Sequence, residues 1–249
     1  MPDISSLSLS FDEVSMTFPD GTEALRDVSL SVNSSEFVSV VGPSGCGKST
    51  LLNIASGLLT PTTGSVEKAN TSLGYIFQDP TLLPWRTVMR NVELLCELHK
   101  IPKEDRRERA QKAINLVGLT GFEKYFPKAL SGGMKMRTSL DRTLTLYPEV
   151  FLFDEPFGSL DEITREKLND ETQTLFQKEG FASLFITHSI PEAVFLSTKV
   201  YVMSERPGAI VAAFDIPFNY PRVPDQRFDP GFAEICREIS NALRGAPNE

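Results

Sequence analysis

The segment that most constrains this chain is Gly-Pro-Ser-Gly-Cys-Gly-Lys-Ser at residues 42–49. It matches G-x-x-x-x-G-K-[ST], a pattern whose glycines let backbone N–H groups converge on phosphate oxygens. The pattern has this meaning only between a buried strand and a helix. Residues 37–41 are almost all apolar, and residues 48–58 have helical apolar spacing and stop before Pro61. The flanks therefore predict a phosphate-binding loop that opens a helix, in which Lys48 meets phosphates and the Ser49 hydroxyl meets Mg²⁺.

A second site is predicted at residues 150–155, Val-Phe-Leu-Phe-Asp-Glu. Four apolar residues indicate a buried strand, and the two acids fall at its carboxyl end, where parallel sheets hold ligands. A strand that merely ends at the surface would look the same. Beside a phosphate loop, however, the two acids suit two tasks. Asp154 would hold a hydrated magnesium ion, and Glu155 would orient and deprotonate an attacking water molecule.

The remaining pattern indicates a parallel sheet preceded by antiparallel strands, with a helical insertion between residues 85 and 147. Two early segments alternate apolar and polar residues, as half-buried antiparallel strands do. The expected strands are 7–11, 24–32, 37–41, 150–153, 183–186 and 199–203, and the expected helices are 48–58, 87–100, 103–117, 134–146 and 231–243.

Composition narrows the class of protein. The formal net charge of −8 disfavours nucleic acid as the main partner. The sequence has no apolar run of about eighteen residues and no export signal, so we expect a cytoplasmic location. Cys46, Cys96 and Cys236 are scattered and odd in number, which argues against a disulfide framework or a zinc site.

A third element is Leu-Ser-Gly-Gly-Met at residues 130–134, which precedes a helical segment. Taken alone, it is best explained as an ordinary helix start with a serine cap. Its position between the other two elements changes this interpretation. The order of glycine loop, Leu-Ser-Gly-Gly and apolar strand with Asp-Glu resembles the ATP-binding-cassette (ABC) ATPases from about residue 11 to residue 203.

The resemblance implies an α/β fold: a P-loop (RecA-like) ATPase core with an N-terminal antiparallel β subdomain and an inserted α-helical subdomain. We expect a single ABC ATPase domain over residues 1–249. Its core would comprise residues 1–84 and 148–215, its helical subdomain residues 85–147, and its C-terminal extension residues 216–249.

The resemblance also assigns site residues that would, one at a time, more often be structural. Phe18 matches the aromatic that stacks on adenine, Gln78 a ligand of Mg²⁺ and water, and His188 the histidine that reaches the γ-phosphate. Asp161 lies in the loop that crosses to a partner subunit. The expected ATP-binding residues are Phe18, Gly42, Ser44, Gly45, Cys46, Gly47, Lys48, Ser49 and Thr50; the catalytic residues are Glu155, His188 and Gln78; the metal ligands are Ser49, Gln78 and Asp154.

In this family Leu-Ser-Gly-Gly binds the γ-phosphate held by the opposite subunit of a head-to-tail dimer. The resemblance therefore implies that Ser131, Gly132 and Gly133 bind ATP in trans, and that a second cassette, identical or homologous, is required. The sequence departs from the family afterwards, with Met136 in place of glutamine and Asp141 in place of alanine. Asp141 could pair with Arg137 or Arg142.

Residues 78–88 form a proline-stiffened apolar loop with the only tryptophan, Trp85. A core-packing turn would explain it as well, but in transporter cassettes the matching segment receives a helix of the membrane subunit. Residues 77–85, 160–164 and 205–208 resemble importers for nitrate, sulfonates, taurine and bicarbonate. The resemblance implies membrane permease subunits, indirectly a substrate-binding protein, no nucleic acid, and a place on the cytoplasmic face of the membrane. The alternative is a soluble non-transport ABC ATPase acting on nucleic acid or ribosomes.

Overall fold

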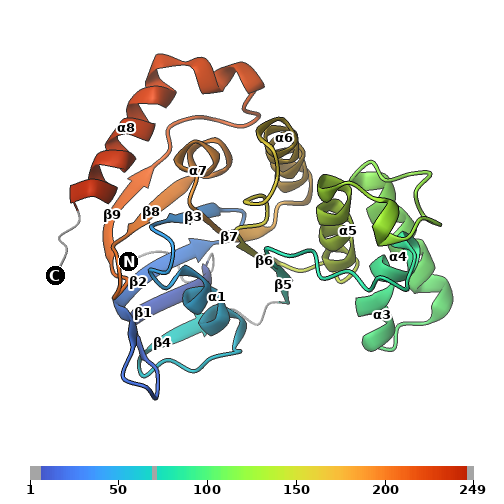
Figure 1. Ribbon diagram of the computed structural model, residues 1–249, viewed down its shortest axis with the longest axis horizontal. Coiled ribbons are helices and arrows are strands. Elements are labelled where there is room, and N and C mark those ends of the chain that lie inside the picture. The colour runs from blue at the N-terminus through green and yellow to red at the C-terminus, as the bar shows by residue number, and fades with distance from the viewer. Residues whose placement is uncertain (1–6, 69–71, 246–249) are drawn as a thin grey trace.

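The computed structural model describes residues 7–68 and 72–245. Two β-sheets and the helices around them form a core, and a lobe of helices projects from one side of it (Figure 1). Within these residues, none of the helices combines the length and the apolar character needed to cross a membrane.

The larger sheet carries the site. Its strands lie in the order β5-β6-β7-β3-β8-β9, and β9 alone is antiparallel to its neighbour. The strands are β3 (Phe37–Val41), β5 (Leu73–Ile76), β6 (Val150–Asp154), β7 (Ala182–Thr187), β8 (Lys199–Met203) and β9 (Ile210–Asp215). Because β3 and β6 are parallel, the glycine loop after β3 and the two acids at the end of β6 lie along the same edge.

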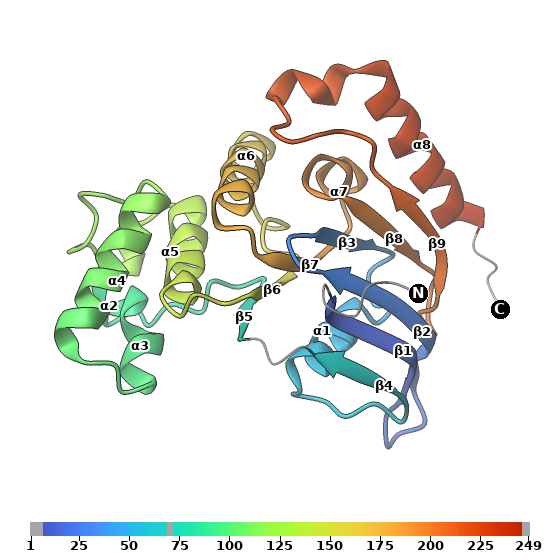
Figure 2. The same ribbon diagram turned by 180° about the vertical axis from the view of Figure 1, so that it is seen from behind.

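Both faces of this sheet are covered. Helices α6 (Glu162–Glu179), α7 (Ile190–Leu196) and α8 (Pro230–Gly245) lie on one face, and α1 (Lys48–Ser56) lies with the smaller sheet on the other (Figures 1 and 2). Alternate side chains of β3 enter two different cores: Phe37 and Val41 pack on the helix side, and Val38 and Val40 pack on the α1 side. Burial on both faces explains why these strands read as continuous apolar runs.

The smaller sheet is antiparallel, with the order β2-β1-β4, and its strands are β1 (Leu7–Thr17), β2 (Glu23–Asn33) and β4 (Thr63–Lys68). The first two confirm the antiparallel start, although β1 continues past the predicted end at residue 11. Strands β4, β5 and β9 were not predicted. Strand β4 is an edge strand with one apolar side chain, Val66, so it has no apolar alternation to detect.

The helical lobe contains α2 (Val88–Val92), α3 (Leu94–Leu98), α4 (Lys103–Leu116) and α5 (Gly132–Leu144). The prediction of one helix over residues 87–100 is wrong, because α2 ends at Val92 and α3 begins at Leu94. Between them lies Glu93, whose carboxylate is buried and pairs with Arg90 at 3.1 Å and with Arg107 at 3.5 Å. The apolar spacing on both sides of Glu93 is the same, so the pattern does not reveal the interruption.

Helix α5 contains a buried carboxylate. Asp141 is fully buried, and neither carboxylate oxygen has a hydrogen-bond partner in the described part of the chain. The pairing suggested for it is wrong: Arg137 binds Glu171 at 2.7 Å, and Arg142 donates to the carbonyls of Pro80 and Thr81. Burial raises the pKa of Asp141 well above its usual 3.8, although the charge of Arg137 lowers it in part.

This pKa predicts how Asp141 affects stability. The unfolded carboxyl ionises at its ordinary pKa while the folded carboxyl keeps its proton, so folding becomes less favourable as pH rises above about 4. Each pH unit between the two pKa values costs about 1.4 kcal/mol. We expect Asp141→Ala to raise the free energy of unfolding, by a larger margin at pH 7 than at pH 5. Urea unfolding of both proteins at both pH values measures this, and equal margins would contradict it.

The segment after β9 is anchored by Arg222, which is almost fully buried. Its guanidinium donates to the carbonyls of Val194 and Phe195, at the end of α7, and to the carbonyl of Phe218. Its backbone N–H and C=O both bond to the side chain of Gln173 in α6. The C-terminal segment is therefore joined to both helices on this face of the sheet.

Removing this guanidinium would leave buried carbonyls without donors. We expect Arg222→Met to lower the free energy of unfolding by about 3 kcal/mol or more. Arg237→Met is a matched control, because Arg237 is exposed on α8 and, among the residues that the structure describes, pairs only with Glu234 of its own helix. Denaturant unfolding compares the two, and similar losses of stability would show that Arg222 has no special role.

Candidate functional site

The glycine loop joins β3 to α1. Gly45 and Gly47 have φ of 78° and 111°, a region that favours glycine. A Cβ on Gly47 would come within 2.6 Å of the Ala24 carbonyl oxygen, and a Cβ on Gly42 within 2.9 Å of Cys46 Sγ. Glycine is therefore favoured by backbone conformation at position 45, by lack of space at position 42, and by both at position 47. Gly47 is the N-cap of α1, so the loop ends where that helix presents its free N–H groups.

Lys48 lies inside the loop and is almost fully buried. Its ammonium donates to the carbonyls of Gly42 at 2.9 Å and Pro43 at 2.8 Å, and lies 3.5 Å from Glu155 Oε1. A buried ammonium needs partners of this kind, and an incoming phosphate is a stronger one than a carbonyl. Two carbonyls of the loop thus converge on the ammonium of Lys48.

The carboxylate of Asp154 lies beside the loop. The Ser49 hydroxyl donates to Asp154 Oδ1 at 2.9 Å, and the Tyr75 hydroxyl donates to Oδ2 at 3.3 Å. Burial raises the pKa of Asp154, and these two hydrogen bonds lower it in part. A hydroxyl and a carboxylate oxygen side by side suit Mg²⁺, which takes few protein oxygens and completes its shell with water and phosphate. The two residues therefore fit the predicted metal site.

Tyr75 was not predicted. It lies on β5, which pairs with β6, and its ring stacks on Phe77 with centroids 4.2 Å apart. Burial and the neighbouring Asp154 raise the pKa of Tyr75, so its hydroxyl stays a donor to that carboxylate. The register of β5 against β6 is what brings Tyr75 to Asp154, and no local sequence signal shows that register.

Glu155 follows directly and turns away from the strand, with a φ of 44° that is unusual for a residue other than glycine. Its Oε2 lies 3.0 Å from Nδ1 of His188, and its Oε1 faces Lys48. His188 follows β7, the neighbour of β6, and Ser189 after it caps α7. The structure therefore joins the predicted base and the predicted histidine in one hydrogen-bonded pair, held by a backbone conformation that clusters at functional sites.

Two other predicted residues lie at the margins of this site. Gln78 is exposed two residues beyond the end of β5, along the edge that also holds Asp154. Phe18 is partly buried in a tight turn closed by the bond from its N–H to the Thr22 carbonyl.

The Leu-Ser-Gly-Gly element lies apart from the glycine loop. Ser131 caps α5, where its hydroxyl accepts from the Met134 N–H at 3.3 Å. A Cβ on Gly132 would contact Leu160 at 2.9 Å, and one on Gly133 would contact Thr164 at 2.8 Å. Figures 1 and 2 both show α5 and α1 on opposite sides of β5. The element therefore lies beside the Asp161 loop, with Ser131 and Gly132 exposed, and away from Lys48.

Asp161 has a local structural role. It caps α6, and its carboxylate accepts from the Thr164 N–H at 3.0 Å, a bond that lowers the pKa of Asp161. The cap fixes the exposed loop before α6.

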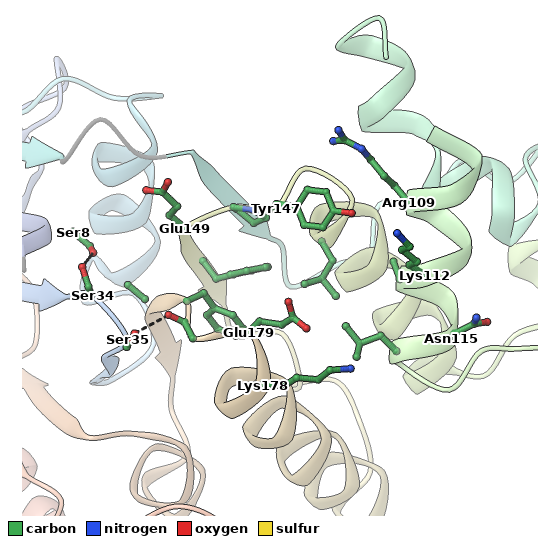
Figure 3. Close-up of a pocket in the computed structure, with 18 of the residues that line it drawn as sticks. Ser8, Ser34, Ser35, Arg109, Lys112, Asn115, Tyr147, Glu149, Lys178 and Glu179 are labelled. Atoms are coloured by element: carbon green, nitrogen blue, oxygen red, sulfur yellow. Dashed lines mark hydrogen bonds between the residues drawn. The ribbon is translucent and has the colours of Figure 1, made fainter. Parts of the chain in front are cut away.

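A cavity of about 880 Å³ lies at the other end of the strands (Figure 3). It is bounded by Ser34 and Ser35 before β3, Glu149 before β6, Lys112 on α4 and Lys178 on α6. Because the glycine loop and the acids lie at the carboxyl ends of β3 and β6, this cavity is separate from the site described above. It marks the junction between the helical lobe and the core.

Comparison with known proteins agrees with this geometry. Residues 25–158 match the family model described as ABC transporter. An uncharacterised ABC transporter ATP-binding protein of Methanocaldococcus jannaschii is 44% identical over 229 residues, covering 89% of this chain and 85% of that relative. The taurine import ATP-binding protein TauB of Yersinia pestis is 42% identical over 228 residues, covering 89% of this chain and 86% of that relative.

A solved structure of an ATP-binding cassette is also similar to this chain. The ATP-binding cassette MJ0796, solved as a dimer in a post-hydrolysis state with ADP and Pi, superposes with a TM-score of 0.73 at 30% identity. The match covers 85% of this chain and 100% of that one. Family match, identity and fold together show that the chain belongs to the ABC transporter family, in which it is an ATP-binding cassette and an ATPase.

Proposed function

We propose that this chain is the ATP-hydrolysing subunit of an importer for a small solute of the nitrate, sulfonate, taurine or bicarbonate class. It would work as a head-to-tail dimer beneath membrane permease subunits, on the cytoplasmic face of the membrane. The observation that carries the proposal is the incomplete site: Lys48, Ser49, Asp154, Glu155 and His188 converge, whereas the Leu-Ser-Gly-Gly element lies elsewhere with Ser131 and Gly132 exposed.

Each half of this site supplies a different part of catalysis. On binding ATP, Lys48 would exchange the carbonyls of Gly42 and Pro43 for phosphate oxygens. Ser49 and Asp154, with Gln78, would hold Mg²⁺, which neutralises phosphate charge when bound. Glu155 would take a proton from the attacking water. His188, which is hydrogen-bonded to the Glu155 carboxylate, would hold that carboxylate in place and reach the γ-phosphate.

The second half would come from another cassette. Ser131 offers a hydroxyl, Gly132 and Gly133 allow close approach, and α5 directs its positive end outwards. The dimeric state of MJ0796 supports this arrangement as a precedent in a related cassette. Each ATP would then contact both subunits, and its γ-phosphate would be bound by residues of both.

The loop before α2 supplies a contact for the permease. Trp85 is 71% exposed, which is unusual for the only tryptophan of a chain. Hydrogen bonds hold the loop backbone on either side of Trp85: Asn91 is fully buried and donates to the carbonyls of Leu83 and Arg86. A rigid loop with an exposed aromatic suits a socket for a helix of a membrane subunit, through which dimer closure would be transmitted.

The taurine importer name of one relative supports the small-solute class, and the test is direct. The chain is isolated with its attached proteins from native membranes, and ATP hydrolysis is measured with taurine, sulfonates, nitrate or bicarbonate and the partner binding protein. We expect co-purified permease subunits and stimulation by one of these solutes. Co-purification with RNA or ribosomes, and ATPase stimulated by them, would instead support the non-transport alternative.

A further inference from the structure

The turn between β8 and β9 contains Glu205-Arg-Pro-Gly208, a motif that the proposed function leaves unused. The turn is well ordered internally, because the Ser204 hydroxyl donates to the carbonyls of Glu205 and Pro207 and accepts from the Ala209 N–H. The β8–β9 turn is far from the glycine loop in the sequence, but the two are in direct contact in the fold.

The turn and the glycine loop touch through their backbones. Gly208 N–H donates to the Ala24 carbonyl at 3.0 Å, and that carbonyl also lies against Gly47. A Cβ on Gly208 would come within 2.2 Å of the carbonyl oxygen of Cys46. The turn, the start of β2 and the glycine loop therefore pack backbone against backbone.

Arg206 extends this contact at the exposed side of the loop. Its Nε and Nη2 donate to the Gly45 carbonyl at 3.1 and 2.9 Å. The pKa of Asp20 is lowered chiefly by its hydrogen bonds to Thr22, and the positive charge of Arg206 makes a small further contribution.

The bond to Gly45 has a geometric consequence. In a trans peptide the N–H points opposite to the C=O, so the Cys46 N–H points away from Arg206. It donates to the Pro43 carbonyl at 3.4 Å, and the same carbonyl binds the Lys48 ammonium. The Cys46 N–H is thus inside the loop and the guanidinium outside it. A cation on the carbonyl also strengthens the N–H of the same peptide as a donor.

We propose that Arg206 is a positioning residue for phosphate binding. Its guanidinium holds the peptide between Gly45 and Cys46 so that the Cys46 N–H faces a phosphate oxygen of the bound nucleotide. This inference rests on the proposed role of residues 42–49 as the phosphate site. It adds a residue from the β8–β9 turn that acts through the loop without touching the nucleotide.

The experiment compares ADP with inorganic pyrophosphate, which lacks the nucleoside. Binding of each to the full-length chain is measured by calorimetry for wild type, Arg206→Gln, Arg206→Lys and Glu205→Gln. Glu205 is exposed on the same turn and is the matched control. We expect Arg206→Gln to weaken both ligands roughly tenfold, Arg206→Lys to weaken both less, and Glu205→Gln to change neither. In hydrolysis, Arg206→Gln should raise KM for ATP and leave kcat nearly unchanged.

Two results would overturn the inference. If ADP binding weakens and pyrophosphate binding does not, Arg206 acts on the nucleoside and not through the loop. If neither ligand is affected, the bond to Gly45 has no role in binding. If thermal melts show that Arg206→Gln is unfolded, the same comparison of ADP and pyrophosphate binding is made with Arg206→Lys. The proposed function is tested separately by Lys48→Ala: if that variant binds ADP like wild type, the phosphate site itself is wrong.

Discussion

Glu155→Gln should lower the rate of ATP hydrolysis by about a thousandfold while leaving ATP binding intact. Glutamine keeps the shape of the side chain and the hydrogen bond to His188, but it cannot take a proton from water. Because ATP would then persist at the proposed dimer interface, we also expect an ATP-dependent dimer that dissociates slowly. Steady-state phosphate release and size-exclusion chromatography with Mg-ATP measure the two effects.

A matched control lies at the other end of the same strand. Glu149 is exposed immediately before β6, so Glu149→Gln makes the same chemical change away from the glycine loop. It should hydrolyse ATP like the wild type. Hydrolysis by Glu155→Gln within a few fold of this control would remove Glu155 from its role as the base.

Ser131→Asp should lower hydrolysis by at least a hundredfold, and Ser131→Asn much less. Both replacements are good helix caps and preserve the acceptor for the Met134 N–H, so neither should destabilise α5. Only aspartate adds a negative charge, which would repel the γ-phosphate held by the other subunit. A single chain should still bind ATP, because Ser131 lies away from its own glycine loop.

Four measurements separate these effects: thermal melts for stability, ATP binding by the dilute monomer, ATP-dependent dimerisation, and turnover. A purely structural serine predicts that both variants behave like wild type in all four. Equal hydrolysis by the aspartate and asparagine variants would contradict binding in trans. Loss of ATP binding by the dilute monomer would place Ser131 in the site of its own chain.

The sequence predicts this site well where the chemistry depends on strand ends. The apolar runs before Gly42 and before Asp154 indicate buried parallel strands, and the ends of such strands meet at one edge. Ser49 and Asp154 are 105 residues apart in sequence and hydrogen-bonded in space for this reason.

What the sequence does not show are contacts that depend on register or on a distant segment. Tyr75 reaches Asp154 only because β5 pairs with β6. Arg206 reaches Gly45 only because the β8–β9 turn packs against the glycine loop. Asp141 was expected to pair with a neighbouring arginine, but helix α5 directs Arg137 to Glu171 of α6, and neither oxygen of the buried Asp141 carboxylate has a hydrogen-bond partner among the described residues. The spacing of residues within a helix or strand predicts which face a side chain occupies, but it does not predict which residue that side chain contacts.

The cavity in Figure 3 has a mechanical consequence. A second pocket of about 450 Å³ lies between α5 and α6, so two open pockets, of about 880 and 450 Å³, lie along the boundary between lobe and core. Close-packed layers resist shear, whereas a boundary interrupted by open pockets has fewer contacts to break when one side turns against the other. We therefore expect this boundary to deform more easily than the sheets or the helical lobe. A structural change caused by ATP binding or hydrolysis would then reach Trp85 as a rotation of the helical lobe as one body.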